Sequence, residues 1–213
     1  MTHATLFDYY RSSASYRVRI ALNLKGIGHD SVSINLAEGA QKQAEYRSRN
    51  PQGLVPMLEI DGQRIAQSLA IIEYLDRTRA DPPLIPRDPA DAAHVRSLAL
   101  LIACDIHPLN NLRVLKYLSG PLAQEDAARD QWYAHWVREG FLALEAVAAP
   151  RAGRFLFGDG PSLADVCLVP QIYNARRFDV ALDDFPLLLR VDGECATLEA
   201  FAQAHPDVIA ASA

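Results

Sequence analysis

The stretch that decides the fold spans residues 11–22 and reads RSSASYRVRIAL. It follows the apolar and aromatic segment ATLFDYY at residues 4–10, which predicts a buried strand. Val18 and Ala21 begin one apolar helical stripe, and Gly26 suits the end of that helix. The serines therefore stand at a helix N-terminus, where unpaired backbone N–H groups and the helix dipole favour an anion.

A serine at such a position has two interpretations. As an N-cap its oxygen accepts a backbone N–H, and an isolated serine-rich turn usually does no more than this. As part of a binding site its hydroxyl also donates to a thiolate or a carboxylate. Other segments of the chain favour the second interpretation.

Composition excludes several classes of protein. The chain has 213 residues, of which half are hydrophobic and 22% are charged, as in an ordinary globular protein of one or two domains. A net charge of −5 argues against nucleic-acid binding. The apolar stretches are too short to cross a membrane, and the start, MTHATLFDYYRSS, lacks the layout of a secretion signal.

The cysteines agree with a protein of the cytoplasm. Cys104, Cys167 and Cys195 are far apart and odd in number, so they form neither a disulfide framework nor a CxxC motif. We also find no metal-binding spacing. We therefore expect a cytoplasmic protein with reduced thiols, no metal, and neither a membrane nor a nucleic acid as partner.

Residues 1–80 alternate strand and helix signals, which predicts a small α/β layer. Asp61-Gly62 is a two-residue hairpin signal between two of the strands. The expected strands cover residues 4–10, 29–35, 55–60 and 63–66, and the expected helices cover 15–25, 41–48 and a segment beginning at Ser68.

Residues 79–90 are rich in proline, and we place a linker at 81–88. From residue 89 to residue 213 the pattern is helical throughout, and Ser162 with Asp165 indicates a capping box. The helical periods run over residues 90–117, 124–149, 162–178 and 187–204, with a kink expected at His107-Pro108.

Two further segments of the α/β part suit a bound peptide. Pro56 enters a strand, which places it at a sheet edge or in a strained turn. The context favours a cis Val55-Pro56 bond, although a trans proline at a strand start is the plainer interpretation. An edge strand would leave the Val55 backbone free to pair with a peptide. Gln67-Ser68 stands at a second helix N-terminus, where Ser68 would hold a carboxylate or serve only as a cap.

The chain as a whole resembles the zeta class of glutathione transferases. The resemblance rests on five segments in order: SSASYRVRIALNLKG, NPQGLVPMLEIDG, QSLAIIEYLD, DIHPLNNLRVLKYL and SLADVCLVPQIYNARRF. It implies a thioredoxin-like α/β N-terminal domain (1–80) joined to an all-helical C-terminal domain (89–213). It also implies glutathione as cofactor and a homodimer.

The same resemblance implies the site residues. Ser12 would donate to the glutathione sulfur, with Ser13 and Ser15 beside it. The tripeptide itself would be held by Gln41, Val55, cis-Pro56, Gln67, Ser68, His107 and Asn111. Many zeta enzymes have a cysteine where this chain has Ala14, so activity or inactivation that depends on that thiol is in doubt here.

The expected reaction is the glutathione-dependent cis–trans isomerisation of maleylacetoacetate to fumarylacetoacetate in tyrosine and phenylalanine breakdown. Maleylpyruvate is the close alternative substrate, and transfer to or dehalogenation of small halo acids could accompany it. A non-catalytic interaction protein of the same fold is the alternative from another class.

A substrate with two carboxylates requires cations. Arg11 precedes the serines, Arg113 follows Asn111, and Arg176-Arg177 ends a predicted helix. Neighbouring helical residues point about 100° apart, so at most one of the last two should face the substrate, and the resemblance favours Arg177. A solvated surface position, or stabilisation of the helix C-terminus, is the plain interpretation of Arg113 and of this pair.

Overall fold

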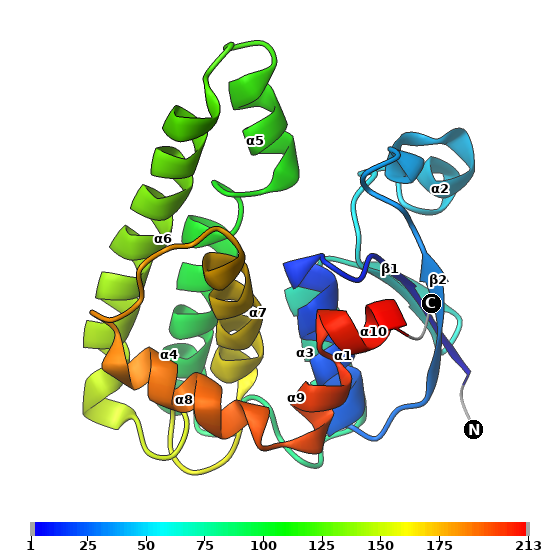
Figure 1. Cartoon of the computed structure of the whole chain (residues 1–213). Helices are drawn as coiled ribbons and strands as arrows, with labels where there is room; N and C mark the ends of the chain where they lie inside the picture. Colours follow the sequence, from blue (N-terminus) through cyan, green and yellow to red (C-terminus); the bar gives the residue numbers. More distant parts are fainter. Residues whose placement is uncertain (1–2, 212–213) are drawn as a thin grey trace. The chain divides into compact units, whose positions relative to one another are not determined.

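The structure is a computed structural model that describes residues 3–211 (Figure 1). Its contacts divide the chain into two compact units, one made of the described residues up to Pro83 together with those from Ala196 on, the other of Leu84–Cys195. In the first unit the strands and helices are β1 (Ala4–Asp8), α1 (Ser13–Leu24), β2 (His29–Ser33), a 3₁₀ turn (Ala40–Lys42), α2 (Ala44–Arg49), β3 (Met57–Ile60), β4 (Gln63–Ala66), α3 (Ser68–Thr78), α9 (Glu199–Gln203) and α10 (Pro206–Ala211).

The four strands form one sheet in the order β2-β1-β3-β4. β1 is parallel to β2 and antiparallel to β3, and β3 is antiparallel to β4. β3 is therefore an interior strand, and the expectation that it lies at an edge is wrong. It is a short strand buried between two neighbours, so its proline has to lie before the first ladder bond. Pro56 does so.

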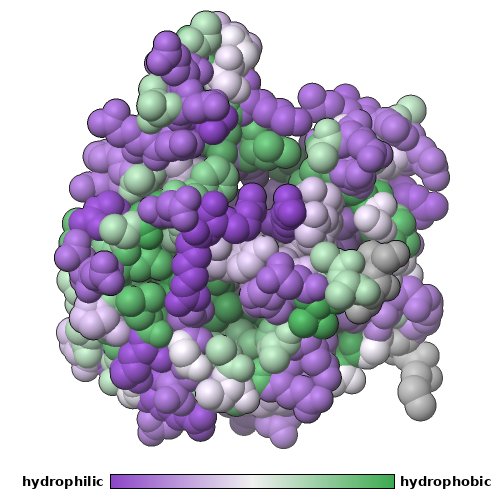
Figure 2. Space-filling model, in the orientation of Figure 1, coloured by the Kyte–Doolittle hydropathy of each residue, from purple (hydrophilic) through white to green (hydrophobic). Residues whose placement is uncertain are grey.

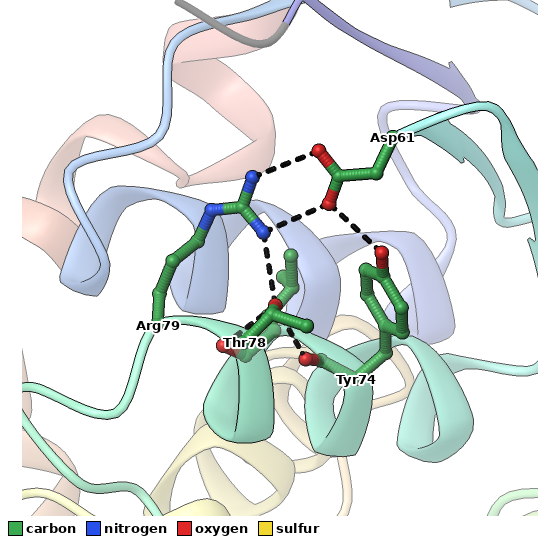
Figure 3. A network of polar contacts seen from close by, with 5 residues as sticks. Asp61, Tyr74, Thr78 and Arg79 are labelled. Carbon is green, nitrogen blue, oxygen red and sulfur yellow. Dashed lines mark hydrogen bonds and ion pairs between the residues drawn. The ribbon is translucent and has the colours of Figure 1, made fainter.

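The Asp61-Gly62 hairpin forms as predicted, with φ of 53° and 73° at its two turn residues. Asp61 also ties the turn to the end of α3, as Figure 3 shows. Its carboxylate accepts from the Tyr74 hydroxyl at 2.8 Å and from both terminal nitrogens of Arg79 at 3.0 and 3.2 Å. This network fixes the C-terminal end of α3 against the hairpin. It does not involve the N-terminal end of the helix, at Ser68.

α1 is buried on almost every side, since each residue from Ser15 to Leu22 is buried. Such a helix needs internal partners for its polar side chains. Arg19 meets this requirement within the first unit, because it is 1% exposed and pairs with Asp8. Arg17 is 2% exposed, and one of its nitrogens, Nη1, donates to the Ser68 hydroxyl at 3.5 Å.

The second unit is helical apart from one isolated bridge among its described residues. Its helices are α4 (Pro89–Leu100), a π-helical segment (Leu101–Ile106), α5 (Leu112–Ser119), α6 (Asp126–Ala148), a 3₁₀ turn (Ala149–Arg151), α7 (Leu163–Arg177) and most of α8 (Pro186–Ala196). The capping box of α7 is present, with both the Ser162 backbone N–H and its hydroxyl donating to Asp165.

The helical period expected over residues 90–117 is interrupted where its kink was predicted, at His107-Pro108. α4 continues into the π segment, and a turn at 107–111 separates that segment from α5. A close contact accompanies the π segment, because Ile106 packs against α6 at Gly140, where a Cβ would come within 2.2 Å of its side chain. Periodicity alone does not reveal such a contact.

The helix expected over residues 187–204 is divided as well, into α8, α9 and the turn before α10. Residues 196–211 group with the first unit and not with the helical unit. They do so because Ala200 and Ala204 offer carbonyls to α1 side chains and Phe201 is buried. The domain boundaries 1–80, 81–88 and 89–213 stay predictions, and the contacts differ from them at this end. In Figure 1 the orange-red helix α9 lies beside the blue α1.

Several properties concern the molecule as a whole. On the face drawn in Figure 2, hydrophilic residues cover much of the surface and hydrophobic ones show between them. All three cysteines are free, and Cys167 and Cys195 are buried. Within residues 3–211, no helix combines the length and apolarity needed to cross a membrane, and no cluster of side chains could hold a metal ion.

Candidate glutathione and substrate sites

The strand register brings three predicted segments to one end of the sheet. Phe7 near the end of β1 pairs with Met57 at the start of β3, and Met57 pairs with Ala66 at the end of β4. The loop after β1 leads to Ser12, the segment before β3 contains Val55-Pro56, and the residues after β4 are Gln67 and Ser68. Antiparallel pairing therefore gathers in space what the sequence separates by more than fifty residues.

Ser12 caps α1 and keeps a donor to spare. Its backbone is extended, and its Oγ accepts the N–H of Ser15 at 3.3 Å. The plain interpretation as an N-cap is thus correct, but the hydroxyl proton is not used in that bond. Because the Ser12 oxygen accepts a backbone N–H, its O–H is a better donor to an anion. Ser12 is half-buried and Arg11 is exposed with its guanidinium over the Tyr10 ring.

The segment before β3 is held by its carbonyl at Leu54. The Tyr46 hydroxyl and the Asn50 side-chain amide each donate to this oxygen at 2.7 Å. The next peptide bond, Val55-Pro56, is cis, as predicted. Val55 is 9% exposed, and its backbone N–H and C=O form no hydrogen bond with any described residue. The free backbone N–H and C=O that were expected on an edge strand therefore belong to Val55, which precedes the interior strand β3.

The start of α3 has an unusual backbone. Gln67, at the cap position, has φ of 72° and ψ of 118°, and its side chain makes no cap hydrogen bond. Residues other than glycine rarely adopt this backbone conformation, and those that do are found preferentially at functional sites. The Gln67 amide instead donates to Gln52 at 2.8 Å. The first N–H groups of α3 are therefore without a side-chain acceptor from their own cap residue, and Ser68 beside them is 6% exposed.

Two predicted polar groups nearby lack a partner within the described chain. The Ser15 hydroxyl and the side-chain oxygen of Gln41 are buried without a hydrogen bond. Gln41 lies against the segment before Val55, because a Cβ on Gly53 would stand 2.9 Å from its carbonyl oxygen. Ser13 is buried in the first turn of α1. Unsatisfied buried groups are rare and call for an explanation, and a ligand provides one.

Sequence analysis missed Arg17 and Arg19 as parts of this region. Both lie among apolar residues of α1. Their alternation with Val18 and Ile20 was the signal in the sequence that these arginines are buried. Arg17 reaches Ser68 and so joins α1 to the start of α3. A buried guanidinium next to a helix N-terminus adds positive potential where an anion would bind.

In the second unit, the turn at 107–111 carries two of the predicted residues. His107 follows the π segment, and Asn111 caps α5 by accepting the Arg113 N–H at 3.1 Å. Asn111 therefore has a structural role that sequence analysis did not assign. Arg113 lies in the exposed first turn of α5. The turn is joined to α6 by the Asn110 amide, which donates to the Tyr133 carbonyl at 3.3 Å.

The two arginines at the end of α7 differ in their partners. Arg176 pairs with Asp192 at 2.6 Å, and Asp192 is 8% exposed. Arg177 has no acidic partner among the described residues; its guanidinium lies over the Phe178 ring and donates to Asn174 at 2.9 Å. Arg176 therefore has an acidic partner, whereas within residues 3–211 no carboxylate forms an ion pair with Arg177.

Tyr133 is linked to the turn at 107–111 through Asn110, and its hydroxyl is near the charge of Arg177. The Tyr133 ring stacks on Phe178 with centroids 3.9 Å apart. Burial raises the pKa of the Tyr133 hydroxyl, and the nearby positive charge of Arg177 opposes that rise. Arg177 is thus held beside an aromatic pair at the end of α7.

Comparison with known proteins agrees with this arrangement. The model of the glutathione S-transferase N-terminal domain matches residues 11–78, and that of the C-terminal domain matches residues 126–205. A maleylacetoacetate isomerase of Rhizobium meliloti is 51% identical over 95% of both chains.

Two solved structures are similar over nearly the whole chain. The holo structure of a zeta-class bacterial maleylpyruvate isomerase is 43% identical, with a TM-score of 0.94 over 96% of this chain and 97% of its own. A maleylacetoacetate isomerase of Methylobacterium extorquens with bound malonate and glutathione is 37% identical, with a TM-score of 0.92 over 96% and 97%.

This chain belongs to the zeta class of the glutathione S-transferase family. The predicted fold class, a thioredoxin-like α/β part with an all-helical part, is confirmed.

Proposed function

We propose that this chain is a glutathione-dependent isomerase that converts maleylacetoacetate to fumarylacetoacetate. The observation that carries the proposal is the grouping of three open groups at one end of the sheet. They are the Ser12 hydroxyl, the Val55 backbone and the start of α3 at Ser68. They correspond in kind to the thiol, the backbone and the γ-glutamyl carboxylate of glutathione. The similarity to maleylacetoacetate isomerases supports the choice of reaction.

Glutathione fits the donors and acceptors that are present. The free N–H and C=O of Val55 would pair with its cysteinyl backbone as in strand addition. Ser68 and the N–H groups of α3 would hold its carboxylate, with Gln67 beside them. The unpartnered Gln41 oxygen and Ser15 hydroxyl offer further hydrogen bonds. His107 and Asn111 remain proposed contacts that rest on the resemblance alone.

When bound, glutathione supplies a thiolate that adds to the cis double bond and is released after rotation, so that it is not consumed. Ser12 would donate its O–H to the sulfur, and the N-terminus of α1 would add positive potential. Both effects lower the pKa of a thiol below its usual value of about 8.5. Ser13 lies in the same turn. Ala14 contributes no thiol, so the proposed chemistry needs only the hydroxyl.

The dicarboxylate substrate would be held by arginines. We assign this role to Arg177 first, because no acidic side chain among the described residues forms an ion pair with its planar guanidinium. Arg11 and Arg113 are exposed cations that could bind the second carboxylate. We leave Arg176 out of the site because Asp192 already pairs with it.

An isomerisation assay with maleylacetoacetate and with maleylpyruvate, each with and without glutathione, tests the proposal. We expect turnover that requires glutathione and is faster with maleylacetoacetate. Preference for maleylpyruvate would assign the alternative substrate. Equal rates without glutathione would exclude the mechanism, and failure to bind immobilised glutathione would favour a non-catalytic interaction protein. Transfer to small halo acids is measured with the same enzyme.

We further propose that the protein is a homodimer in the cytoplasm. Membership of the family supports the dimer, and three free cysteines suit a reducing compartment. Light scattering of the purified protein tests the dimer, and fractionation of the cells that express it tests the location.

A further inference from the structure

We propose that Arg19 is a positioning residue through which the C-terminal segment, residues 196–211, fixes the loop that carries Ser12. This inference rests on the proposed function, because it concerns the binding of the glutathione sulfur. It deepens that function by naming what holds the thiol-binding group in place.

The guanidinium of Arg19 joins three parts of the first unit. Nη1 donates to both carboxylate oxygens of Asp8, at 2.9 and 2.8 Å, and Nη2 donates to the Tyr10 carbonyl at 3.0 Å. Nε donates to the Ala204 carbonyl at 3.0 Å. The end of β1, the loop at residues 9–12 and the C-terminal segment therefore meet at one buried, planar group. Its fork geometry sets all three positions together.

The loop at residues 9–12 has few other internal bonds. The Ser12 N–H donates to the Tyr9 carbonyl at 2.8 Å, which closes the turn. The Tyr10 carbonyl is oriented by Arg19, and the following peptides lead directly to the Ser12 hydroxyl. A hydroxyl stabilises an anion only when its oxygen lies at hydrogen-bonding distance from that anion. A displacement of about 1 Å can cost a hundredfold in rate.

The C-terminal segment is anchored well enough to act as a support. Phe201 is 1% exposed, and the Asn23 amide donates to the Ala200 carbonyl at 3.0 Å. The ring of His205 meets that of Tyr16 edge-on with centroids 6.0 Å apart. Tyr16 in turn lies under the Arg19 guanidinium at 5.3 Å. The segment thus presents the Ala204 carbonyl to Arg19 from a fixed position.

The chain provides a matched control at the other end of α1. Lys25 is also buried and also pairs with a carboxylate, that of Asp76, at 2.6 Å. It lies thirteen residues after Ser12, about 20 Å away along the helix. Arg19→Lys keeps the charge beside Asp8 but cannot reach all the acceptors at once. Lys25→Arg likewise keeps the charge and disturbs the packing, but far from the loop.

The experiment measures the pKa of the bound glutathione thiol by its thiolate absorbance, together with kcat and KM. For Arg19→Lys we expect that pKa to rise by about one unit and kcat to fall about tenfold at neutral pH, with a smaller change in KM. Lys25→Arg should leave the thiol pKa and kcat near those of the wild type. Wild-type values in a folded Arg19→Lys protein, or equal shifts in both variants, would overturn the proposal.

Two additions keep the result decisive. If Arg19→Lys does not fold, Phe201→Ala, which loosens the C-terminal segment, is measured in its place with the same criteria. Amide hydrogen exchange of Ser12 without ligand should speed up in Arg19→Lys and not in Lys25→Arg. A wild-type protein that does not bind glutathione contradicts the proposed function, and the exchange data then decide the role of Arg19 separately.

Discussion

The two helix starts of the first unit differ in what they leave open. At α1 the cap residue, Ser12, has an ordinary extended backbone, satisfies the Ser15 N–H and keeps its own proton as a donor. At α3 the cap residue, Gln67, has a positive φ, and its side chain turns away to Gln52. One start is capped and offers an O–H; the other is uncapped and offers N–H groups.

On the proposed function, this difference would let two similar helix termini hold different parts of glutathione. A spare hydroxyl suits a single soft anion such as a thiolate, because one donor meets one sulfur. A row of free N–H groups suits a carboxylate, which accepts several hydrogen bonds. The same principle separates Arg176 from Arg177 in the proposed site, since Arg176 is paired with Asp192 and Arg177 has no acidic partner among the described residues.

The largest effect is expected at the capped start. Ser12→Ala removes the proposed donor to sulfur, and we expect kcat to fall by about 10²- to 10³-fold, as for the loss of one anion-stabilising donor. It also removes a cap, at a cost of about 1 kcal/mol. Steady-state kinetics with a melting curve separate these effects. Unchanged kinetics with a lower Tm would return Ser12 to the role of a cap.

The two arginines of α7 extend the comparison to the substrate. Arg177→Gln should raise KM for the dicarboxylate by about 10- to 100-fold, the range for losing a charge-assisted hydrogen bond. Arg176→Gln should instead lower the melting temperature, because it removes the ion pair with the buried Asp192. The reverse pattern in kinetics and melting would contradict the assignment.

At the uncapped start the effect should appear in binding. Ser68→Ala removes a hydroxyl beside the proposed carboxylate site, and we expect KM for glutathione to rise about tenfold. The chemical step should change little, since the sulfur is held at the other start. Titration with glutathione measures the loss, and a fall confined to kcat would break the distinction between the two starts.

The smallest effect concerns the strained backbone. Gln67→Gly allows the positive φ without a Cβ, so the free energy of unfolding should rise by roughly 1 kcal/mol despite the lost bond to Gln52. Glutathione binding should weaken at the same time because the start of α3 becomes more flexible. Denaturant unfolding provides the first measurement and ligand titration the second. A protein that is both less stable and equally able to bind would contradict strain at this position.

The features predicted best from the sequence depend on local chemistry. Asp61-Gly62 forms its hairpin because both residues tolerate positive φ, and Ser162 with Asp165 forms its capping box because the two groups are three residues apart. The π segment at Leu101–Ile106 and the end of α8 at Ala196 could not be predicted in this way. They accompany the packing of Ile106 on Gly140 and the hydrogen bond from Arg19 to the Ala204 carbonyl, and both contacts join residues far apart in the chain.

The candidate site shows the same limit. Its residue types, Ser12, Val55-Pro56 and Gln67-Ser68, were identified from the sequence, because helix starts and prolines carry their signal within a few residues. The interior place of β3, the buried roles of Arg17 and Arg19 and the separation of Arg176 from Arg177 were not.

The sequence by itself therefore determined the class of fold, the helix starts and the kinds of groups that a peptide thiol would meet. Only the tertiary structure decided which of those groups keep an open hydrogen bond or an unpaired charge. The physical reason is that a donor, acceptor or charge is used up by whichever partner lies beside it. That partner is chosen by strand register and helix packing, not by neighbouring sequence.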